Sequence, residues 1–395
     1  MEQRRKNLTQ LFIPICLETL LYMLSGMVDT LMLSSVNDQA VGAVGTANTY
    51  IGIFIIMFSV ISSGMVAVMT QNIGAGRPGV AYQARQLGLA FNAVLGVIMS
   101  LFLSLGAGTI LSGVGVADAL MQPAKTYLQI VGGFCILNAL IPICSSYLRA
   151  FGFSKEPLYA SIIGNVINFC LNAFFLFVLH KGVAGVATAT VISRIINLVI
   201  VVLLGAVLVK AKQHPERESN RAVMGQIIRI GLPSACETAI YNVSMTLVIR
   251  FLNQMDAQGL NVTARSYTMQ ITNFSYCVGA ALAQANAIMT GWHIGAKEYD
   301  ACDRGTKKAA VIGVIVAVIL ETVFTLCSGW IMQLFSKDPQ MVSLVGKLLA
   351  IDIVLEIGRV TNLVYGQALK TSGDAVFPVV MGACFMILCS VGGTY

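Results

Sequence analysis

Long apolar segments recur along almost the whole chain, and they restrict its fold more than any other feature. Each is long enough to cross a bilayer whose hydrocarbon core is about 30 Å thick. They lie near residues 10–34, 41–70, 84–112, 121–150, 157–179, 183–209, 229–252, 262–290, 306–331, 340–368 and 375–395. With 56% hydrophobic and only 11% charged residues, the chain is too apolar for an ordinary soluble domain. The sequence therefore predicts an all-α polytopic membrane protein with about eleven spans.

The basic residues are distributed unevenly between the loops. Most of the 25 Lys and Arg residues fall on the side of the amino terminus, in the short loops that set orientation. This pattern predicts a multi-pass protein of the plasma membrane with its amino terminus in the cytoplasm. The net charge of +7 is thereby explained without a nucleic-acid partner. The ten Cys residues contain no C-x-x-C and the three His residues lie far apart, so neither a disulfide framework nor a structural metal site is predicted.

The two halves of the chain repeat each other. Three landmarks recur in register about 220 residues later, each separated from its copy by an even number of spans. They are Pro14, Glu18, Thr19 and Tyr22, which recur as Pro233, Glu237, Thr238 and Tyr241; Ile73-Gly74-Ala75, which recurs as Ile294-Gly295-Ala296; and Leu148-Arg149, which recurs as Leu369-Lys370. An even number of spans gives both halves the same sense in the membrane, as in transporters built from parallel repeats.

The repeat divides the chain into lobes. We expect a six-helix lobe over 1–209, a cytoplasmic linker over 210–226 and a second lobe over 227–395. The sixth span of the first lobe predicts a twelfth span beyond Tyr395. The second lobe is therefore expected to hold five spans and to be truncated.

The first span carries two carboxylates on one helical face. Glu18, Tyr22, Gly26 and Asp29 follow one another at intervals of three or four residues. Ionised groups in hydrocarbon cost about 2.5 to 3.5 kcal/mol on insertion scales, so such a face is expected to point into the bundle. Either the acids serve a site there, or they only pair with buried partners.

Several motifs, in order and doubled, carry a likeness to a known family. They are Pro14 with Tyr22-x6-Asp29-Thr30, the loop Gln71-Asn72-Ile73-Gly74-Ala75-Gly76, the turn Leu148-Arg149-Ala150-x-Gly152 before Pro157, and the run from Gly182 to Thr190. Over essentially all its length the chain resembles the multidrug and toxic compound extrusion (MATE) family. The resemblance implies two lobes forming a V, alternating access, and antiport of organic, cationic and amphipathic compounds against protons or sodium. It implies a monomer in the bilayer that needs no cofactor besides an ion gradient.

The resemblance also implies a cation-coupling site. Asp29 matches the family's ion-coupling acid on the first helix, and Asn168, Asn172 and Thr190 match the polar groups around it. Some members carry a second Asp where this chain has Asn172, which removes one charge. A sodium ion at Asp29, the only metal candidate, is therefore less favoured than a proton.

A second polar group is expected in the other lobe. Asp352, Glu356 and Arg359 share one face of the tenth span, and Glu237 lies on the seventh. One interpretation is a buried network in which Arg359 pairs with Glu356 or Glu237; the other is contact with substrate. Glu18, Tyr22 and Gln270 belong to the same set of substrate or network candidates. Arg194, midway along the sixth span, is a candidate partner for an acid of the first helix.

Three other functions compete with antiport. A flippase for lipid-linked precursors, from the same superfamily, should line its cavity with cationic side chains. The first, second, seventh and eighth spans offer only Arg250 and Arg265, at their outer ends. A membrane enzyme would need a catalytic constellation, and no such motif is visible in the sequence. A channel would not require a coupling acid buried in one lobe.

Overall fold

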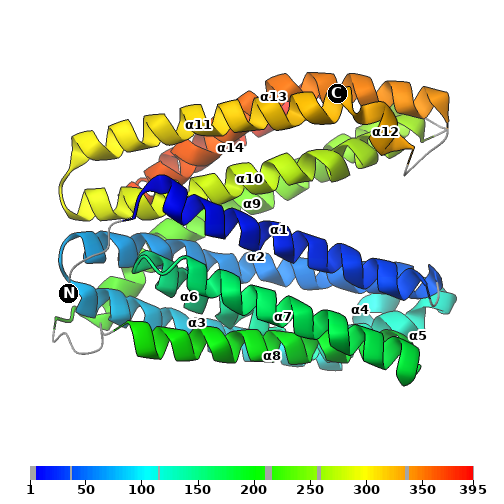
Figure 1. Cartoon of the computed structure of the whole chain (residues 1–395), viewed down its shortest axis with the longest axis horizontal. Coiled ribbons are helices and arrows are strands. Elements are labelled where there is room, and N and C mark those ends of the chain that lie inside the picture. Colours follow the sequence, from blue (N-terminus) through cyan, green and yellow to red (C-terminus); the bar gives the residue numbers. More distant parts are fainter. Residues whose placement is uncertain are drawn as a thin grey trace.

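The computed structural model describes residues 6–35, 38–113, 116–209, 216–255, 259–333 and 338–394, and this part of the chain is helical without strands (Figure 1). The first half forms α1 (Leu8–Ser34), α2 (Asp38–Gly74), α3 (Pro78–Leu105), α4 (Ala107–Gly113), α5 (Asp118–Tyr127), the π-helix η1 (Leu128–Gly132), α6 (Ile136–Ala150), α7 (Lys155–Ala173), the π-helix η2 (Phe174–Val178) and α8 (Gly182–Leu208). The second half forms α9 (Asn220–Met255), α10 (Leu260–Gly295), α11 (Tyr299–Leu326), α12 (Ser328–Met332), α13 (Pro339–Ser372), α14 (Val376–Phe385), the π-helix η4 (Met386–Val391) and α15 (Gly392–Thr394).

Most predicted spans correspond to one helix or to a helix with a π-helical continuation, whereas 84–112 covers α3 and α4, 121–150 covers α5, η1 and α6, and 306–331 covers α11 and α12. Six single helices are long and apolar enough to cross a membrane by length and composition, and a seventh candidate is the pair of α5 with η1 and α6, bent by 42°. Helices α9, α10 and α13 are also long, with 36, 36 and 34 residues, but are more polar. Large apolar side chains cover the outer faces, including Leu105 at 83% and Leu326 at 80% exposure, as expected for a surface in contact with lipid.

The connection between the halves is shorter than the predicted linker over 210–226. Residues 210–215 lie outside the described part, and α9 already begins at Asn220. The difference arises because hydropathy marks only the membrane-embedded part of a helix. The first turns of α9 carry Arg221 and Arg229, which suit the aqueous end of a helix and not its apolar middle.

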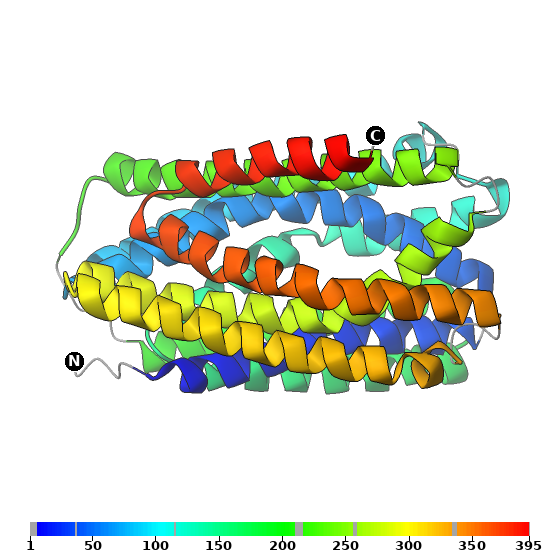
Figure 2. The same cartoon turned by 90° about the horizontal axis from the view of Figure 1, so that it is seen from above.

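The helix bounds confirm the internal repeat. Helices α3, α5 and α7 begin at Pro78, Asp118 and Lys155. Their counterparts α11, α13 and α14 begin at Tyr299, Pro339 and Val376, so the offset along the chain is the same for all three pairs. The counterparts also pack alike, since α3 contacts η1 and α6 while α11 contacts α13. At the edge of the second lobe, α14 and η4 lie along α9 (Figure 2). We call the end where α2, α6 and α8 finish the linker end, and the opposite one the far end; in Figure 1 the linker end is at the left.

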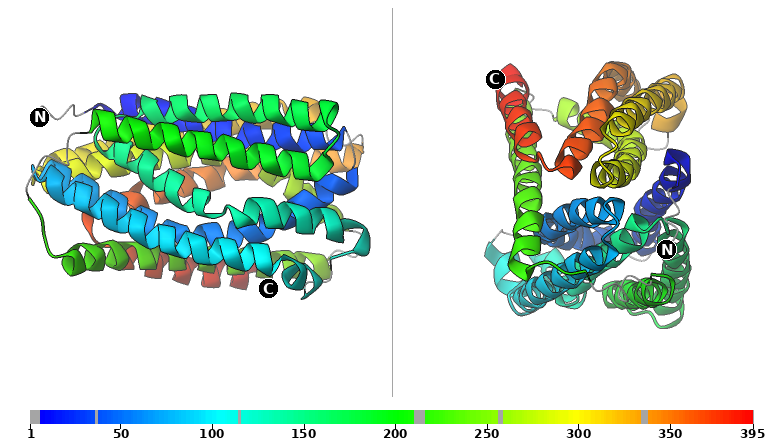
Figure 3. Two further views of the ribbon diagram at one scale, coloured as in Figure 1. Left: turned by 90° about the horizontal axis from the view of Figure 1, so that it is seen from below. Right: turned by 90° about the vertical axis from the view of Figure 1, so that its left-hand side faces the viewer.

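Apolar cores join the lobes at the linker end and stay separate at the far end. One cluster takes residues from both lobes, among them Leu11, Met69, Ile227 and Trp292. At the far end, one cluster around Leu33 and Leu103 comes from the first lobe alone, and another around Ala264 and Val345 comes from the second alone. The end-on view in Figure 3 shows the two groups of helices side by side. This arrangement allows the far ends to separate while the linker ends remain packed.

Two hydrogen bonds cross between the lobes in equivalent positions. Nε2 of Gln71 on α2 donates to the carbonyl of Thr371 on α13 at 2.5 Å. Nε1 of Trp292 on α10 donates to the carbonyl of Ala150 on α6 at 2.9 Å. Gln71 and Trp292 are counterparts in the repeat, as are Ala150 and Thr371. We call these bonds the paired cross-lobe bonds.

Glycines bring the backbones together beside these bonds. A Cβ added to Gly74 would overlap the backbone of Trp292, and a Cβ added to Gly295 would overlap the backbone of Gln71. Because these glycines are counterparts too, the closure of the linker end follows the same two-fold pseudosymmetry. Side chains larger than hydrogen are excluded at both positions.

Candidate functional site

The carboxylate of Asp29 lies between α1 and α7. Its Oδ1 accepts a hydrogen bond of 2.6 Å from Nδ2 of Asn172, and the same nitrogen donates to Oδ1 of Asn168 at 3.2 Å. Asn172 is fully buried, and its Oδ1 has no hydrogen-bond partner in the described part of the chain. The structure therefore brings together three of the four residues predicted for the first-lobe site.

The fourth residue, Thr190, is buried on α8, but its hydroxyl donates to the carbonyl of Val186 in its own helix at 2.9 Å. Arg194 lies one turn further along α8. Its charge acts on Asp29, although no ion pair joins the two among the described residues. Tyr127 at the end of α5 also lies near Asp29. Sequence reasoning missed Tyr127 because no motif marks it and only the packing of α5 brings it there.

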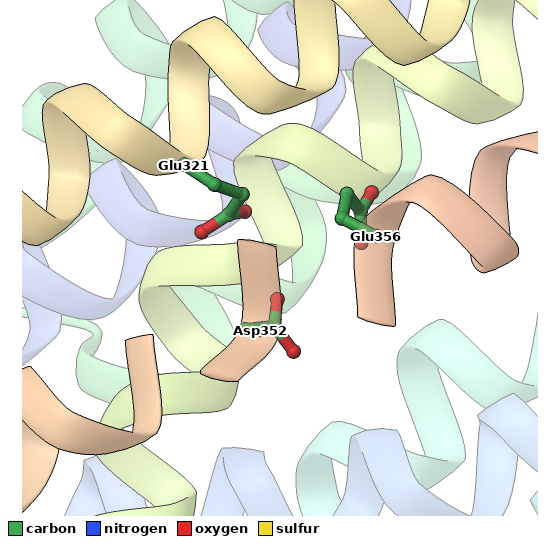
Figure 4. Close-up of side chains that lie close together, drawn as sticks. All are labelled: Glu321, Asp352 and Glu356. Carbon is green, nitrogen blue, oxygen red and sulfur yellow. The ribbon is translucent and has the colours of Figure 1, made fainter. Parts of the chain in front are cut away.

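Around Asp29 the described contacts offer one carboxylate and the amide groups of Asn168 and Asn172. Hard cations require several oxygen ligands, mainly carboxylate and carbonyl groups. Here a single carboxylate faces the amide nitrogen of Asn172, which can only donate. Within the residues that the structure describes, the one group of three metal-ligating side chains lies in the second lobe and consists of Glu321, Asp352 and Glu356 (Figure 4).

Glu18 and Glu237 are held in equivalent ion pairs nearer the linker end. Glu18 on α1 pairs with Nη2 of Arg149 on α6 at 2.5 Å, and Nη1 of Arg149 donates across the lobes to Gln284 at 2.9 Å. In the second lobe Glu237 on α9 pairs with Lys370 on α13. Each of these two acids thus has a cationic partner within its own lobe.

Lys370 should be required for stability as the partner of Glu237. The two side chains are 11% and 20% exposed, so Lys370→Met leaves a poorly solvated carboxylate without its cation. Breaking such a pair by removing one partner costs about 3–5 kcal/mol. We expect a clear loss of thermal stability in detergent. The double variant Glu237→Gln with Lys370→Met should recover most of it, and equal melting of single and double variants would contradict the pairing.

On the face of α13 that carries Asp352 and Glu356, Arg359 takes the first of its two expected partners. Nη1 of Arg359 lies 2.7 Å from Oε2 of Glu356, and its Nη2 lies 3.5 Å from Oδ1 of Asp352. The other predicted partner of Arg359, Glu237, binds Lys370 instead. Lys370 repeats the position of Arg149, so Glu237 pairs with Lys370 as its counterpart Glu18 pairs with Arg149.

Two remaining candidates form no hydrogen bond or ion pair with these networks in the described part of the chain. Tyr22 is 64% exposed, and Gln270 is exposed on α10. Between the lobes, Asn273 and Cys277 of α10 reach the sulfur of Met23 on α1 at 3.7 and 3.9 Å. Tyr22 and Gln270 therefore remain available to a ligand at this level, but neither is assigned to a site by its contacts.

A family comparison decides the relationship of this chain to known proteins. The family model MatE matches it twice, over residues 14–174 and 233–395, once in each lobe. The chain belongs to the MatE family. As a MATE transporter it is a multi-pass membrane protein of the lipid bilayer, and the resemblance noted in its sequence is confirmed.

Individual MATE relatives span nearly the whole chain. The uncharacterized transporter YisQ of Bacillus subtilis is 33% identical, with 94% of this chain and 83% of YisQ covered. The probable multidrug resistance protein NorM of Thermotoga maritima is 22% identical, with 95% of this chain and 82% of NorM covered.

Solved MATE structures share the fold. A crystal structure of a MATE transporter in the straight conformation superposes with a TM-score of 0.88 at 18% identity, covering 98% of this chain and 86% of that one. An outward-facing multidrug resistance MATE transporter gives 0.87 at 17% identity, covering 98% and 86%. At these identities the likeness shows the two-lobed all-α fold.

Proposed function

We propose that the protein is a secondary antiporter that exports organic compounds, cationic and amphipathic in character, in exchange for protons or sodium by alternating access. The observation that carries the proposal is the contact of Asp29 with Asn172 inside the first lobe of a two-lobed MATE fold. An acid held in one lobe can change charge without breaking the packing between lobes. The relatives named as multidrug resistance proteins support the substrate class.

The distribution of apolar cores supports the transport cycle. The linker end is closed by a core shared between the lobes, while the far-end cores are separate. A substrate released at the far end would leave between the lobes. Uptake from the other side then requires that the linker end open and the far ends approach each other.

Protonation of Asp29 supplies the switch in this proposal. The nearest partner of the carboxylate is a neutral amide, so a proton on Asp29 removes a charge and leaves the neighbours in place. Pro14 is buried in the same helix and interrupts its hydrogen-bond ladder, which makes α1 easier to bend below Asp29. A bend there would alter the face of α1 that touches α10.

Transport by the purified protein in vesicles tests the proposal directly. An imposed proton or sodium gradient should drive movement of a fluorescent organic cation, and dissipating that gradient should stop it. Equal movement with and without every gradient would contradict antiport.

The charge distribution of the loops yields a separate prediction about orientation. Ser219 is exposed at the linker end, and the native Cys327 is exposed at the far end. In intact cells an impermeant thiol reagent should label Cys327 but miss a cysteine at position 219 in the variant Ser219→Cys. Permeabilised cells should show both. The reverse pattern would invert the proposed orientation.

A further inference from the structure

A guanidinium without a carboxylate partner lies near the linker end of the first lobe. Arg85 on α3 is partly buried, and no acid in the described part of the chain pairs with it. Its Cζ lies 4.6 Å from the ring centroid of Tyr147 on α6 and 6.0 Å from that of Tyr82 on its own helix. The thiol of Cys144 on α6 is its other polar neighbour. The aromatic rings hold this charge in place, but no anionic side chain neutralises it.

The groups around this guanidinium have unused hydrogen-bonding capacity. Tyr147 is 1% exposed, yet its Oη has no hydrogen-bond partner among the described residues, and the same holds for Nε of Arg85. Oη of Tyr82 accepts a hydrogen bond of 3.3 Å from Nε2 of Gln86, which leaves its own proton free to be donated. Buried polar atoms left without a partner are unfavourable, so a ligand that accepts from them is stabilised. We call Arg85, Tyr82 and Tyr147 the Arg85 cluster.

The cluster lies at the depth where lipid headgroups meet the hydrocarbon of the bilayer. Arg85 is the second residue of the apolar segment 84–112, and Tyr147 stands three residues before the end of the segment 121–150. Tyrosine is enriched at this level of membrane proteins, and arginine extends toward it. Helix α6 lies between α3 and α8 and contacts both (Figure 3), and a Cβ added to Gly205 on α8 would touch the ring of Tyr147. The cluster is therefore placed between transmembrane helices close to one membrane surface.

The fold itself does not require the cluster. The repeat places Thr306 and Ala368 of the second lobe where the first lobe has Arg85 and Tyr147. Both are buried, and the hydroxyl of Thr306 accepts a hydrogen bond of 3.4 Å from Nδ2 of Asn286 within its lobe. Helices α11 and α13 thus pack with small neutral side chains at the positions where α3 and α6 carry a charge and an aromatic ring. The charge is a feature of the first lobe that helix packing does not explain.

We propose that the Arg85 cluster binds the phosphate of an anionic phospholipid in the leaflet at the linker end. Basic sites between transmembrane helices are typical binding places for such headgroups. The planar guanidinium can donate two parallel hydrogen bonds to phosphate oxygens, and the hydroxyls of Tyr82 and Tyr147 are further donors. Because the cluster carries one uncompensated positive charge, it favours a lipid with net negative charge over a zwitterionic one.

The site lies beside contacts that join the lobes. Tyr147 belongs to the last turn of α6, which also carries Arg149 and Ala150. Arg149 donates to Gln284 of the second lobe, and Ala150 accepts one of the paired cross-lobe bonds. A lipid bound at Tyr147 therefore restrains the turn of α6 that holds the linker end closed. This role is separate from the exchange of an ion at Asp29.

Competition between two lipids tests the site without transport. The purified, delipidated full chain in detergent is mixed with equal amounts of phosphatidylglycerol and phosphatidylcholine, and native mass spectrometry gives the ratio of the two lipids bound. One basic residue near the membrane surface favours an anionic lipid by about fivefold. We expect Arg85→Gln to lower the preference for phosphatidylglycerol by at least that factor. Arg221→Gln is the control, because Arg221 is an exposed arginine at the same end on α9, and its preference should stay unchanged.

Two milder variants separate binding from packing. Tyr147→Phe keeps the ring beside Arg85 and removes only the hydroxyl, so the preference should fall by about two- to tenfold, the worth of one hydrogen bond. Arg85→Lys keeps the charge and should retain part of the preference. If Arg85 only stabilised the packing of α3 on α6, its variants would melt earlier but bind the two lipids in the wild-type ratio. A wild-type ratio in Arg85→Gln would overturn the proposal.

Thermal melting distinguishes a lipid from a free anion. Phosphatidylglycerol should raise the melting temperature of the wild type above its value in phosphatidylcholine, and it should have no such effect on Arg85→Gln. Millimolar inorganic phosphate should not reproduce the rise. An equal rise in wild type and Arg85→Gln would place the stabilising lipid elsewhere. A rise with inorganic phosphate that depends on Arg85 would assign the cluster to a soluble anion, and either result would overturn the lipid site.

Discussion

Asp29→Asn should reduce gradient-driven efflux to the level of vesicles without protein. The amide keeps the shape of the side chain and can still accept the hydrogen bond from Nδ2 of Asn172, so the contact between α1 and α7 is preserved. What is lost is the ability to gain and release a proton. Efflux of a fluorescent cation under an imposed gradient measures the effect, and the yield of monodisperse protein confirms folding.

Glu18→Gln is the matched comparison on the same helix. Glu18 lies nearer the linker end and is already paired with Arg149, so its change breaks the ion pair that joins α1 to α6 and leaves the proposed coupling acid in place. We expect it to reduce stability more and coupling less than Asp29→Asn. Near-normal, still proton-driven efflux by Asp29→Asn would remove Asp29 from the mechanism and direct attention to Glu237 and Glu356.

Gly295→Ala and Gly74→Ala should open the linker end. In the described conformation a methyl group at either position would overlap backbone atoms of the other lobe. Overpacking of this kind costs about 1–3 kcal/mol, which is enough to shift a two-state equilibrium between closed and open forms by roughly 5- to 150-fold. The form with a closed linker end is destabilised by that amount, whereas the form with an open linker end has room for the methyl group.

Spin labels at Gln86 and Lys307 would report the change. Both positions are exposed, they are counterparts on α3 and α11, and the distance between them should lengthen in the alanine variants. Gly305→Ala is the control, because a Cβ at Gly305 on α11 meets no atom within 4 Å. Distances that stay unchanged in the two variants, or that lengthen equally in the control, would show that these glycines do not govern closure.

Much of the fold could be predicted because hydropathy and the repeat are properties of single segments. Apolar length identified the spans, and the doubled motif of Glu18 and Glu237 anticipated two equivalent acids. The bend between η1 and α6 was not predictable, since α13 has the same place in the repeat and is continuous. The beginning of α9 was misplaced because its charged first turns lie beyond the apolar stretch.

The sites were predictable only where residues share one helix or one family motif. Asp29, Asn168 and Asn172 were expected together and contact one another. Glu321 was not singled out, because a lone Glu in an apolar segment has no pattern of its own. Its relation to Asp352 depends on how α11 is rotated against α13, which hydropathy does not specify.

The paired cross-lobe bonds bear on how abruptly the protein can change state. Because Gln71 and Trp292 are counterparts placed about one pseudo-two-fold axis, a rigid movement that lengthens one bond lengthens the other at the same moment. Partial opening would break both bonds and the glycine contacts beside them, but the gap between the lobes would still be narrow. Intermediate degrees of opening should therefore be sparsely populated, so that the barrier at the linker end has two discrete states, closed and open, and limits leakage of ions during the proposed cycle.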